Sequence, residues 1–247
     1  MLHPLSEVAS PPPGFTRVEL PSGSFGAFLR AMPMRPSATP VFAYDGAKLL
    51  DGDDPRLFRV ADLDVGARDL QQCADSVIRW HAEWLWSRAE GPKAAYHFVS
   101  GDLASFARYA AGDRPVVIGN RVSWERRAKA RSDRTAYRSY LDVVFTYAST
   151  LSLAREARTL AKEDASPGDF FVLPGGPGHA ILILDIAQDA NGRRIALLGQ
   201  GYMPAQDFHV LASRNPSFSP WFSLDGDAVD TPFWSVPFPW SSLRRFR

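Results

Sequence analysis

Two side chains in this 247-residue chain have the types and spacing of a cysteine hydrolase. Cys73 is the only cysteine, and it follows Asp69-Leu-Gln-Gln72, a capping-box pattern that predicts a helix start. The positive end of a helix stabilises a thiolate, which is the nucleophile of such enzymes. His179 opens an apolar segment about a hundred residues later, so folding could place it beside the thiol. The competing roles are a buried small hydrophobe for Cys73 and a backbone-bonded turn residue for His179.

A polar residue on the following strand could orient His179. Residues 194–199 are expected to return alongside 179–186, which places Gln200 on the same face of the sheet as His179. A four-residue loop at 188–191 would set Gln200 directly opposite His179, whereas a two-residue turn at 191–192 would set it opposite Ile183. Only the first register gives a hydrogen bond to His179. Otherwise Gln200 would cap the strand or contact substrate.

Other polar residues near the thiol could bind substrate. Gln71 or Gln72 could donate to an oxyanion together with the backbone N–H of Cys73, although Gln72 also suits the role of capping-box partner. Arg79 belongs to a helical ladder with Asp75 and Glu83, which we expect to face solvent. If that face were buried, Arg79 could bind an anionic group of the substrate.

The segment Gly168–Asp185 carries a recognisable pattern, GDFFVLPGGPGHAILILD. It resembles the signature of NlpC-type and CHAP-type papain-like peptidases and amidases. In those families a cysteine begins a helix, a histidine begins a strand, and a polar residue on the next strand orients the imidazole. The resemblance implies these roles for Cys73, His179 and Gln200, with an amide or peptide substrate and no cofactor. The cysteine here lies in Gln-Cys-Ala-Asp rather than Asp-Cys-Ser-Gly, so only the small residue after it is kept.

The wider sequence is similar to a bacterial family catalogued as domain of unknown function 4846. The similarity covers roughly residues 15–245, and its name implies no activity. Gly178 and Tyr202 lie in matching segments and are candidate substrate-binding residues. The matching pieces are Asp69–Asp75 with Arg79 and Glu83, Pro167–Asp169, Pro177–Ala180, and Gln200–Gln206 with His209.

Two other functions remain open. A non-catalytic binding module on the same fold would use His179, Gln200, Arg79 and the C-terminal aromatic residues to hold a ligand. A metal-assisted hydrolase could be built around His179 and His209, but the five histidines show no HxH or HExxH spacing, so we expect no metal. We expect the C-terminal aromatic rings to be buried where a Pro-rich chain wraps the sheet.

The elements that must position these residues indicate an α+β fold. Helices are expected at 24–32, 69–88, 102–111 and over most of 132–160, with an interruption near Thr150 and Ser152; strands are expected at 170–173, 179–186 and 194–199. A helical half followed by a strand-rich half predicts helices packed on an antiparallel sheet, as in a papain-like core. We expect a flexible Pro-rich tail at 1–14 and a single domain over 15–247.

Composition narrows the possible functions. Apolar residues make up 45% and charged residues 22%, as in ordinary globular proteins. A net charge of +1 gives no electrostatic case for nucleic acid. One cysteine excludes an internal disulfide framework. No apolar run reaches the roughly 18 residues of a membrane span, and no signal peptide is visible, so we expect a cytoplasmic location.

Overall fold

The computed structural model describes residues 1–247, and its centre is a nine-stranded sheet whose strand pairs are all antiparallel. The main path runs β11-β19-β12-β13-β14-β15-β6, with β2 added to β13 and β16 to β14. This sheet confirms the predicted α+β class. Its strands are β2 (Phe15–Arg17), β6 (Leu57–Val60), β11 (Arg158–Thr159), β12 (Phe170–Leu173), β13 (His179–Asp189), β14 (Arg194–Gln200), β15 (His209–Leu211), β16 (Phe222–Ser223) and β19 (Leu243–Arg245).

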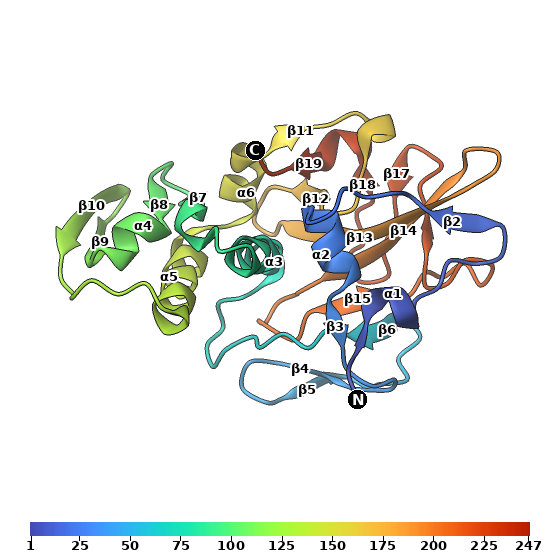
Figure 1. Ribbon diagram of the computed structural model, residues 1–247, viewed down its shortest axis with the longest axis horizontal. Helices are drawn as coiled ribbons and strands as arrows, with labels where there is room; N and C mark the ends of the chain where they lie inside the picture. The colour runs from blue at the N-terminus through green and yellow to red at the C-terminus, as the bar shows by residue number, and fades with distance from the viewer.

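Helix α3 (Cys73–Ser87) lies against the sheet and is seen nearly end-on at the centre of Figure 1, between the strands and α5. It starts at Cys73 with Gln72 as its N-cap, so the prediction of a helix from residue 69 was wrong by one turn. The other helices are α1 (Leu5–Val8), α2 (Phe25–Arg30), α4 (Phe106–Ala110), α5 (Arg134–Tyr147) and α6 (Thr150–Glu156). The expected interruption is present, because Ser149 caps α6. None of these helices has the length and apolar character needed to cross a bilayer.

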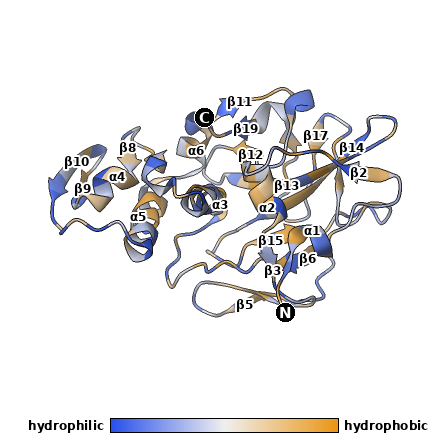
Figure 2. Cartoon of the chain, in the orientation of Figure 1, coloured by the Kyte–Doolittle hydropathy of each residue, from blue (hydrophilic) through white to orange (hydrophobic).

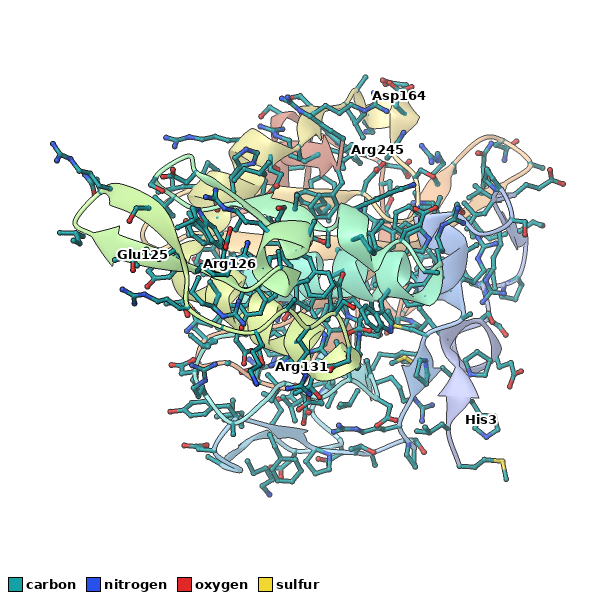
Figure 3. The ribbon with its side chains drawn as sticks, turned by 60° about the vertical axis from the view of Figure 1, so that its left-hand side comes forward. His3, Glu125, Arg126, Arg131, Asp164 and Arg245 are labelled. Carbon is teal, nitrogen blue, oxygen red and sulfur yellow. The ribbon has the colours of Figure 1, made fainter.

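An outer lobe formed by residues 103–147 extends away from the sheet on the left of Figure 1. It holds α4, α5 and the hairpin of β9 (Asp113–Ile118) and β10 (Arg121–Arg126). A helix was predicted over 102–111, but α4 covers only Phe106–Ala110 of that range. Figure 3 labels Glu125, Arg126 and Arg131 in this lobe, and all three are exposed. The remaining short pairs are β1 (His3–Pro4) with β3 (Pro33–Met34), β4 (Val41–Phe42) with β5 (Lys48–Leu50), β7 (Ala95–His97) with β8 (Leu103–Ser105), and β17 (Ala228–Val229) with β18 (Phe238–Pro239).

The sheet separates two apolar cores, and β13 contributes to both. Ala180 and Leu182 belong to the larger core with α3, whereas Ile181 and Ile183 belong to the smaller core on the other face. This alternation follows from the two-residue period of a strand. Figure 2 shows β13 and β14 as a predominantly hydrophobic centre with hydrophilic segments around it. His179 begins β13 and Gln200 ends β14, so these two candidate site residues lie at the same end of the two buried strands.

The N-terminal residues are structured, which corrects the prediction of a flexible tail at 1–14. Residues 3–8 form β1 and α1, and Leu5 is fully buried in the larger core. The indole of Trp221 donates to the backbone carbonyl of Ser10 at 3.0 Å. The proline run at 11–13 prevents a helix there, but it does not prevent the preceding residues from packing through an apolar anchor.

We expect Asp185→Asn to lower the free energy of unfolding by about 3 kcal/mol. The Asp185 side chain is fully buried and accepts from Arg17 at 2.7 Å and from Arg30 at 2.5 Å, so its loss leaves two partly buried cations without their partner. Denaturant unfolding measures the change. Glu125→Gln, which removes an exposed ion pair with Arg127, is the control and should cost less than about 1 kcal/mol. Equal losses in the two variants would contradict this assignment.

Candidate functional site

Cys73 is the first residue of α3, and its side chain lies at the positive end of that helix. Only 5% of the residue is exposed. Burial and the nearby carboxylate of Asp75 raise the pKa of the Cys73 thiol from 9.0 to about 11, although the backbone N–H groups of Ala180, Ala74 and Cys73 itself act to lower it. The thiol is therefore protonated at neutral pH, and its sulfur lies close to the backbone of Ala180, directly after His179.

A close contact between α3 and the end of β14 fixes the position of the thiol. A Cβ atom on Gly201 would lie 2.2 Å from the hydroxyl of Ser76 and 3.1 Å from the carbonyl of Gln72. Glycine therefore lets the first turn of α3 approach the strand. The ladder between β13 and β14 ends at Leu182 and Gly199, so Ala180 has no residue opposite it on β14. This leaves the start of β13 open to the sulfur of Cys73.

His179 and Gln200 form a buried hydrogen bond, with 2.8 Å between Nε2 of His179 and Oε1 of Gln200. The register is neither of the two considered from the sequence, because a β-bulge between Ile183 and Asp185 shifts the pairing. The register at the end of the ladder sets Gln200 across from Ile181, and the side chain reaches His179 diagonally. The Nδ1 atom of His179 is buried and has no hydrogen-bond partner, so the thiol of Cys73 is not bonded to it.

His209 continues this polar row onto the next strand. It pairs with Gln200 in the ladder of β14 and β15, and its Nε2 atom lies 3.3 Å from Nε2 of Gln200. Its Nδ1 atom lies 3.0 Å from the backbone oxygen of Asp207. Burial lowers the pKa values of His179 and His209 to about 4, so both imidazoles are neutral at pH 7. Sequence reasoning considered His209 only as a possible metal ligand.

Aromatic residues cover the row of His179, Gln200 and His209. Trp234 stacks on His179 with 4.8 Å between ring centroids, and Tyr202 meets the same imidazole edge-on at 5.0 Å. Phe233 lies edge-on to His209 at 5.4 Å. The hydroxyl of Tyr202 donates to the backbone oxygen of Phe233 at 3.2 Å, so two of these aromatic residues are joined by a hydrogen bond. Burial and the nearby Cys73 raise the pKa of Tyr202, so this ring is close to the thiol as well as to the imidazole.

A pocket of about 370 Å³ opens beside the thiol. It exposes a side of Cys73 to a space that a small substrate could enter. Asp69 and Asp75 bring carboxyl groups to its wall, and no lysine, arginine or histidine lines it. The other lining residues are Leu70, Gln72, Ala74, Phe145, Thr146, Ala148, Ser149, Thr150, Gly175, Gly176, Pro177, Gly178 and Met203.

The remaining predicted substrate residues lie in different places. Gly178 lines the pocket, and Gln72 lines it while donating to Asp69 at 2.9 Å. Gln71 is turned away, because its side-chain oxygen accepts from Arg79 at 2.7 Å and from Arg138 at 2.8 Å. Arg79 also pairs with Glu83 at 2.6 Å. Neither Gln71 nor Arg79 lines the pocket.

The helical ladder of Asp75, Arg79 and Glu83 is not on a solvated face, contrary to the prediction. Asp75 is 6% exposed and Arg79 is 3% exposed. The guanidinium of Arg79 donates to the backbone oxygen of Asp64 and to Gln71, and Arg134 from α5 reaches Glu83. Helix α5 and the chain before α3 therefore cover this face, and charge periodicity alone could not show that cover.

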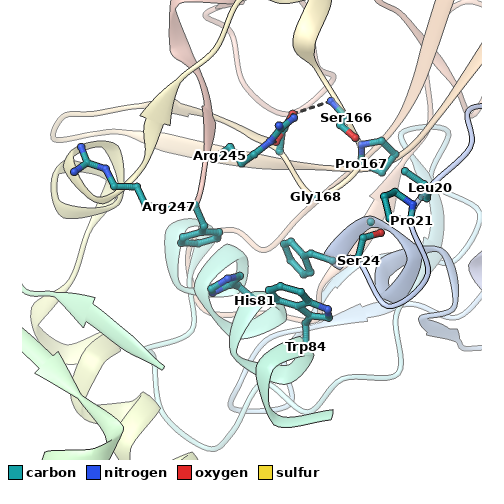
Figure 4. A pocket seen from close by; sticks show the side chains of 14 residues that line it. Leu20, Pro21, Ser24, His81, Trp84, Ser166, Pro167, Gly168, Arg245 and Arg247 are labelled. Carbon is teal, nitrogen blue, oxygen red and sulfur yellow. Dashed lines mark hydrogen bonds and ion pairs between the residues drawn. The ribbon is translucent and has the colours of Figure 1, made fainter. Parts of the chain in front are cut away.

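A second hollow, shown in Figure 4, has a volume of about 320 Å³. His81, Trp84 and Phe25 form its aromatic side, and Arg245 pairs with Asp169 across from them. None of the residues predicted to do chemistry lines it. The structure also contains no cluster of three or more His, Cys, Asp or Glu side chains suited to a metal ion.

Comparison with known proteins adds a family but no activity. A family model described as "Domain of unknown function (4846)" matches residues 5–245, which is nearly the whole chain. No curated protein and no solved structure gives a significant match.

Proposed function

The chain belongs to the domain of unknown function 4846 family, and from its site we propose that it is a cysteine-dependent acyl hydrolase or acyltransferase, of the amidase or peptidase type, on a papain-like core. The observation that carries the proposal is the placement of the Cys73 thiol. Its sulfur lies at the start of α3 beside the N–H of Ala180, the residue directly after His179, whose Nδ1 atom has no partner. A thiol nucleophile needs a base within reach, so the proposal requires Nδ1 of His179 to approach this sulfur during the reaction.

In the proposed reaction the neutral His179 removes the thiol proton. As the sulfur of Cys73 bonds to the substrate carbonyl carbon, the S–H proton moves to Nδ1 of His179 and the carbonyl electron pair moves to oxygen. The carbonyl reforms when the bond to the amine or alcohol breaks, and that leaving group takes the proton from Nδ1. Water then attacks the thioester, transferring its proton through Nδ1 to the departing sulfur. Gln200 holds the imidazole throughout.

Backbone amides at the start of α3 are the best donors for the oxyanion. The first N–H groups of a helix have no partner within it, and those of Cys73 and Ala74 already face the sulfur. Gln71 is held by Arg79 and Arg138, and the amide of Gln72 by Asp69, so these side chains are engaged elsewhere. We therefore place the substrate carbonyl oxygen at the helix end.

A specific observation favours a second candidate, a non-catalytic binding module on the same fold. The Cys73 thiol is buried, and its pKa is raised to about 11 rather than lowered. In this second candidate the thiol would line the pocket and would have no chemical role. The two candidates differ in one measurable property, which is whether Cys73 forms a covalent acyl adduct.

We expect Cys73 to be acylated by p-nitrophenyl esters, and we expect Cys73→Ala to abolish this labelling. Intact mass spectrometry detects the adduct, and the single cysteine makes its position unambiguous. Asp69 lines the pocket without any cation, whereas burial raises the pKa of Asp75 and disfavours its charged form. Because Asp69 repels an anion, an acetyl or glycyl ester should react about tenfold faster than a succinyl half-ester.

A matched variant controls for folding. Ser87 lies at the other end of α3 and is exposed, so Ser87→Ala should leave acylation unchanged. Absence of any adduct on the folded wild-type protein would favour the binding module. A preference for the anionic ester would show that the pocket does not select as its carboxyl groups predict.

A further inference from the structure

We propose that His209 is a positioning residue that fixes the side-chain amide of Gln200 and, through it, the tautomer of His179. This inference rests on the proposed function in one respect, the role of His179 as the base that accepts the proton of Cys73. Three hydrogen-bond contacts hold His179, Gln200 and His209 across β13, β14 and β15. All three side chains are buried, with exposures of 0%, 1% and 0%.

The chain of donors and acceptors begins at a backbone carbonyl. The oxygen of Asp207 can only accept, so Nδ1 of His209 must carry the proton that it donates across 3.0 Å. Burial keeps the His209 imidazole neutral, and a neutral imidazole has one N–H. The Nε2 atom of His209 is therefore a bare acceptor.

The charged groups near His209 do not change this assignment. Asp54 acts to raise the pKa of His209 and Arg56 to lower it, and these two residues form an ion pair at 2.7 Å. The guanidinium of Arg56 lies over the ring of Phe233, which packs edge-on against His209. These two effects act in opposite directions, and burial is the largest cause of the lowered pKa of His209.

A bare acceptor on His209 decides which way the Gln200 amide points. The Gln200 nitrogen lies 3.3 Å from Nε2 of His209 and can donate to it, whereas an oxygen there would face a lone pair. The Gln200 oxygen is consequently directed at His179, 2.8 Å from its Nε2 atom. This oxygen can only accept, so Nε2 of His179 carries the proton.

The consequence for His179 is a lone pair on Nδ1, the atom that has no partner in the structure. If the Gln200 amide were reversed, its nitrogen would donate to Nε2 and the proton would move to Nδ1. That tautomer cannot accept the proton of Cys73. His209 therefore keeps His179 in the form of a base without touching the thiol or the substrate.

The wild-type protein can be tested by long-range proton–nitrogen NMR of labelled histidine at pH 7. We expect His179 to be protonated on Nε2 and His209 on Nδ1. The five histidines can be assigned by substituting them one at a time. A proton on Nδ1 of His179 would overturn the proposal. The tautomers are read from the wild-type protein, and the variants serve only to assign its signals.

Two variants test the positioning role. In His209→Phe the acceptor is lost while a ring of similar size remains, so His179 should become a mixture of tautomers and alkylation of Cys73 by iodoacetamide at pH 7 should slow about tenfold. In His209→Gln the side-chain oxygen can accept from Gln200 again and should restore most of the rate. His97→Ala, which removes a half-exposed histidine on β7, is the control.

The NMR and rate measurements separate failure of this proposal from failure of the proposed function. If His209→Phe leaves both the His179 tautomer and the rate unchanged, His209 does not position the network. If the tautomers are as expected but removal of His179 does not affect the thiol, His209 does position Gln200 and His179, and the assignment of Cys73 as a nucleophile fails.

Discussion

Replacing His179 with alanine is expected to slow alkylation of Cys73 by iodoacetamide at pH 7 by at least about a hundredfold. With a thiol pKa of about 11, only about one molecule in ten thousand carries a thiolate at pH 7. Reactivity at neutral pH then depends on a base that removes the proton during attack. His179 is that base in our proposal, because burial lowers its pKa to about 4 and leaves it neutral.

The same pKa values predict how the difference between wild type and His179→Ala varies with pH. Below about pH 4 the wild-type imidazole is protonated and cannot act as a base, so its advantage should disappear. As the pH approaches 11 the thiol ionises without help, and the two rates should converge. The largest ratio is therefore expected on a plateau between about pH 5 and pH 9.

The chain provides its own controls for this measurement. With one cysteine, mass spectrometry follows a single site, and Cys73→Ala should give no adduct. His81→Asn is a control at a second histidine, because His81 is partly buried, lies on α3 and lines the hollow of Figure 4 instead of the pocket beside Cys73. Equal rates in wild type and His179→Ala would contradict the nucleophile assignment. A wild-type thiol that ionises well below 8.5 would contradict the raised pKa.

The sequence predicts the central strands well because their apolar runs are bounded by turn residues. Residues 170–173 form β12 as expected, and β13 begins at His179. The hydrogen bond between His179 and Gln200 was also expected. The register of β13 and β14 was not predicted correctly. It is shifted by the bulge between Ile183 and Asp185, and the alternation of apolar and polar residues along a strand does not reveal a bulge.

Features that depend on distant packing could not be predicted from local pattern. The ladder of Asp75, Arg79 and Glu83 has the spacing of a solvated face, but α5 supplies Arg134 and Arg138 to cover it. A tail was predicted around Leu5 because the strongest pattern nearby is the proline run Pro11–Pro13. The contact that anchors this segment in the larger core is made by one leucine, Leu5, and a single apolar residue forms no recognisable pattern. The role of Gly201 depends on the approach of α3, which starts more than a hundred residues earlier.

The second large effect concerns stability rather than chemistry. We expect Glu156→Gln to raise the free energy of unfolding at pH 9 by about 4 kcal/mol and to change it little at pH 5. The Glu156 side chain is 10% exposed, and burial raises its pKa from 4.5 to about 8. The folded protein therefore holds this proton more tightly than the unfolded chain does. Stability falls as the pH rises from about 4.5 to about 8, and the loss is complete above that.

Glutamine removes the charge but keeps an oxygen that can accept from the backbone N–H of His97, as Glu156 does at 3.2 Å. Denaturant unfolding of both proteins at pH 5 and pH 9 measures the difference, and Glu163→Gln, at an exposed position, is the control. A similar stability difference between Glu156→Gln and wild type at the two pH values would show that the carboxyl is not buried as the structure has it.

This stability effect also bears on the thiol measurement. Glu156 ends α6, whose first residue, Thr150, lines the pocket beside Cys73. At the alkaline pH where the wild-type and His179→Ala rates should converge, ionised Glu156 weakens the fold around that pocket. Unfolding would expose the thiol and imitate the convergence. The alkaline rates should therefore be measured in the Glu156→Gln background, where convergence reports ionisation of Cys73 in the folded protein.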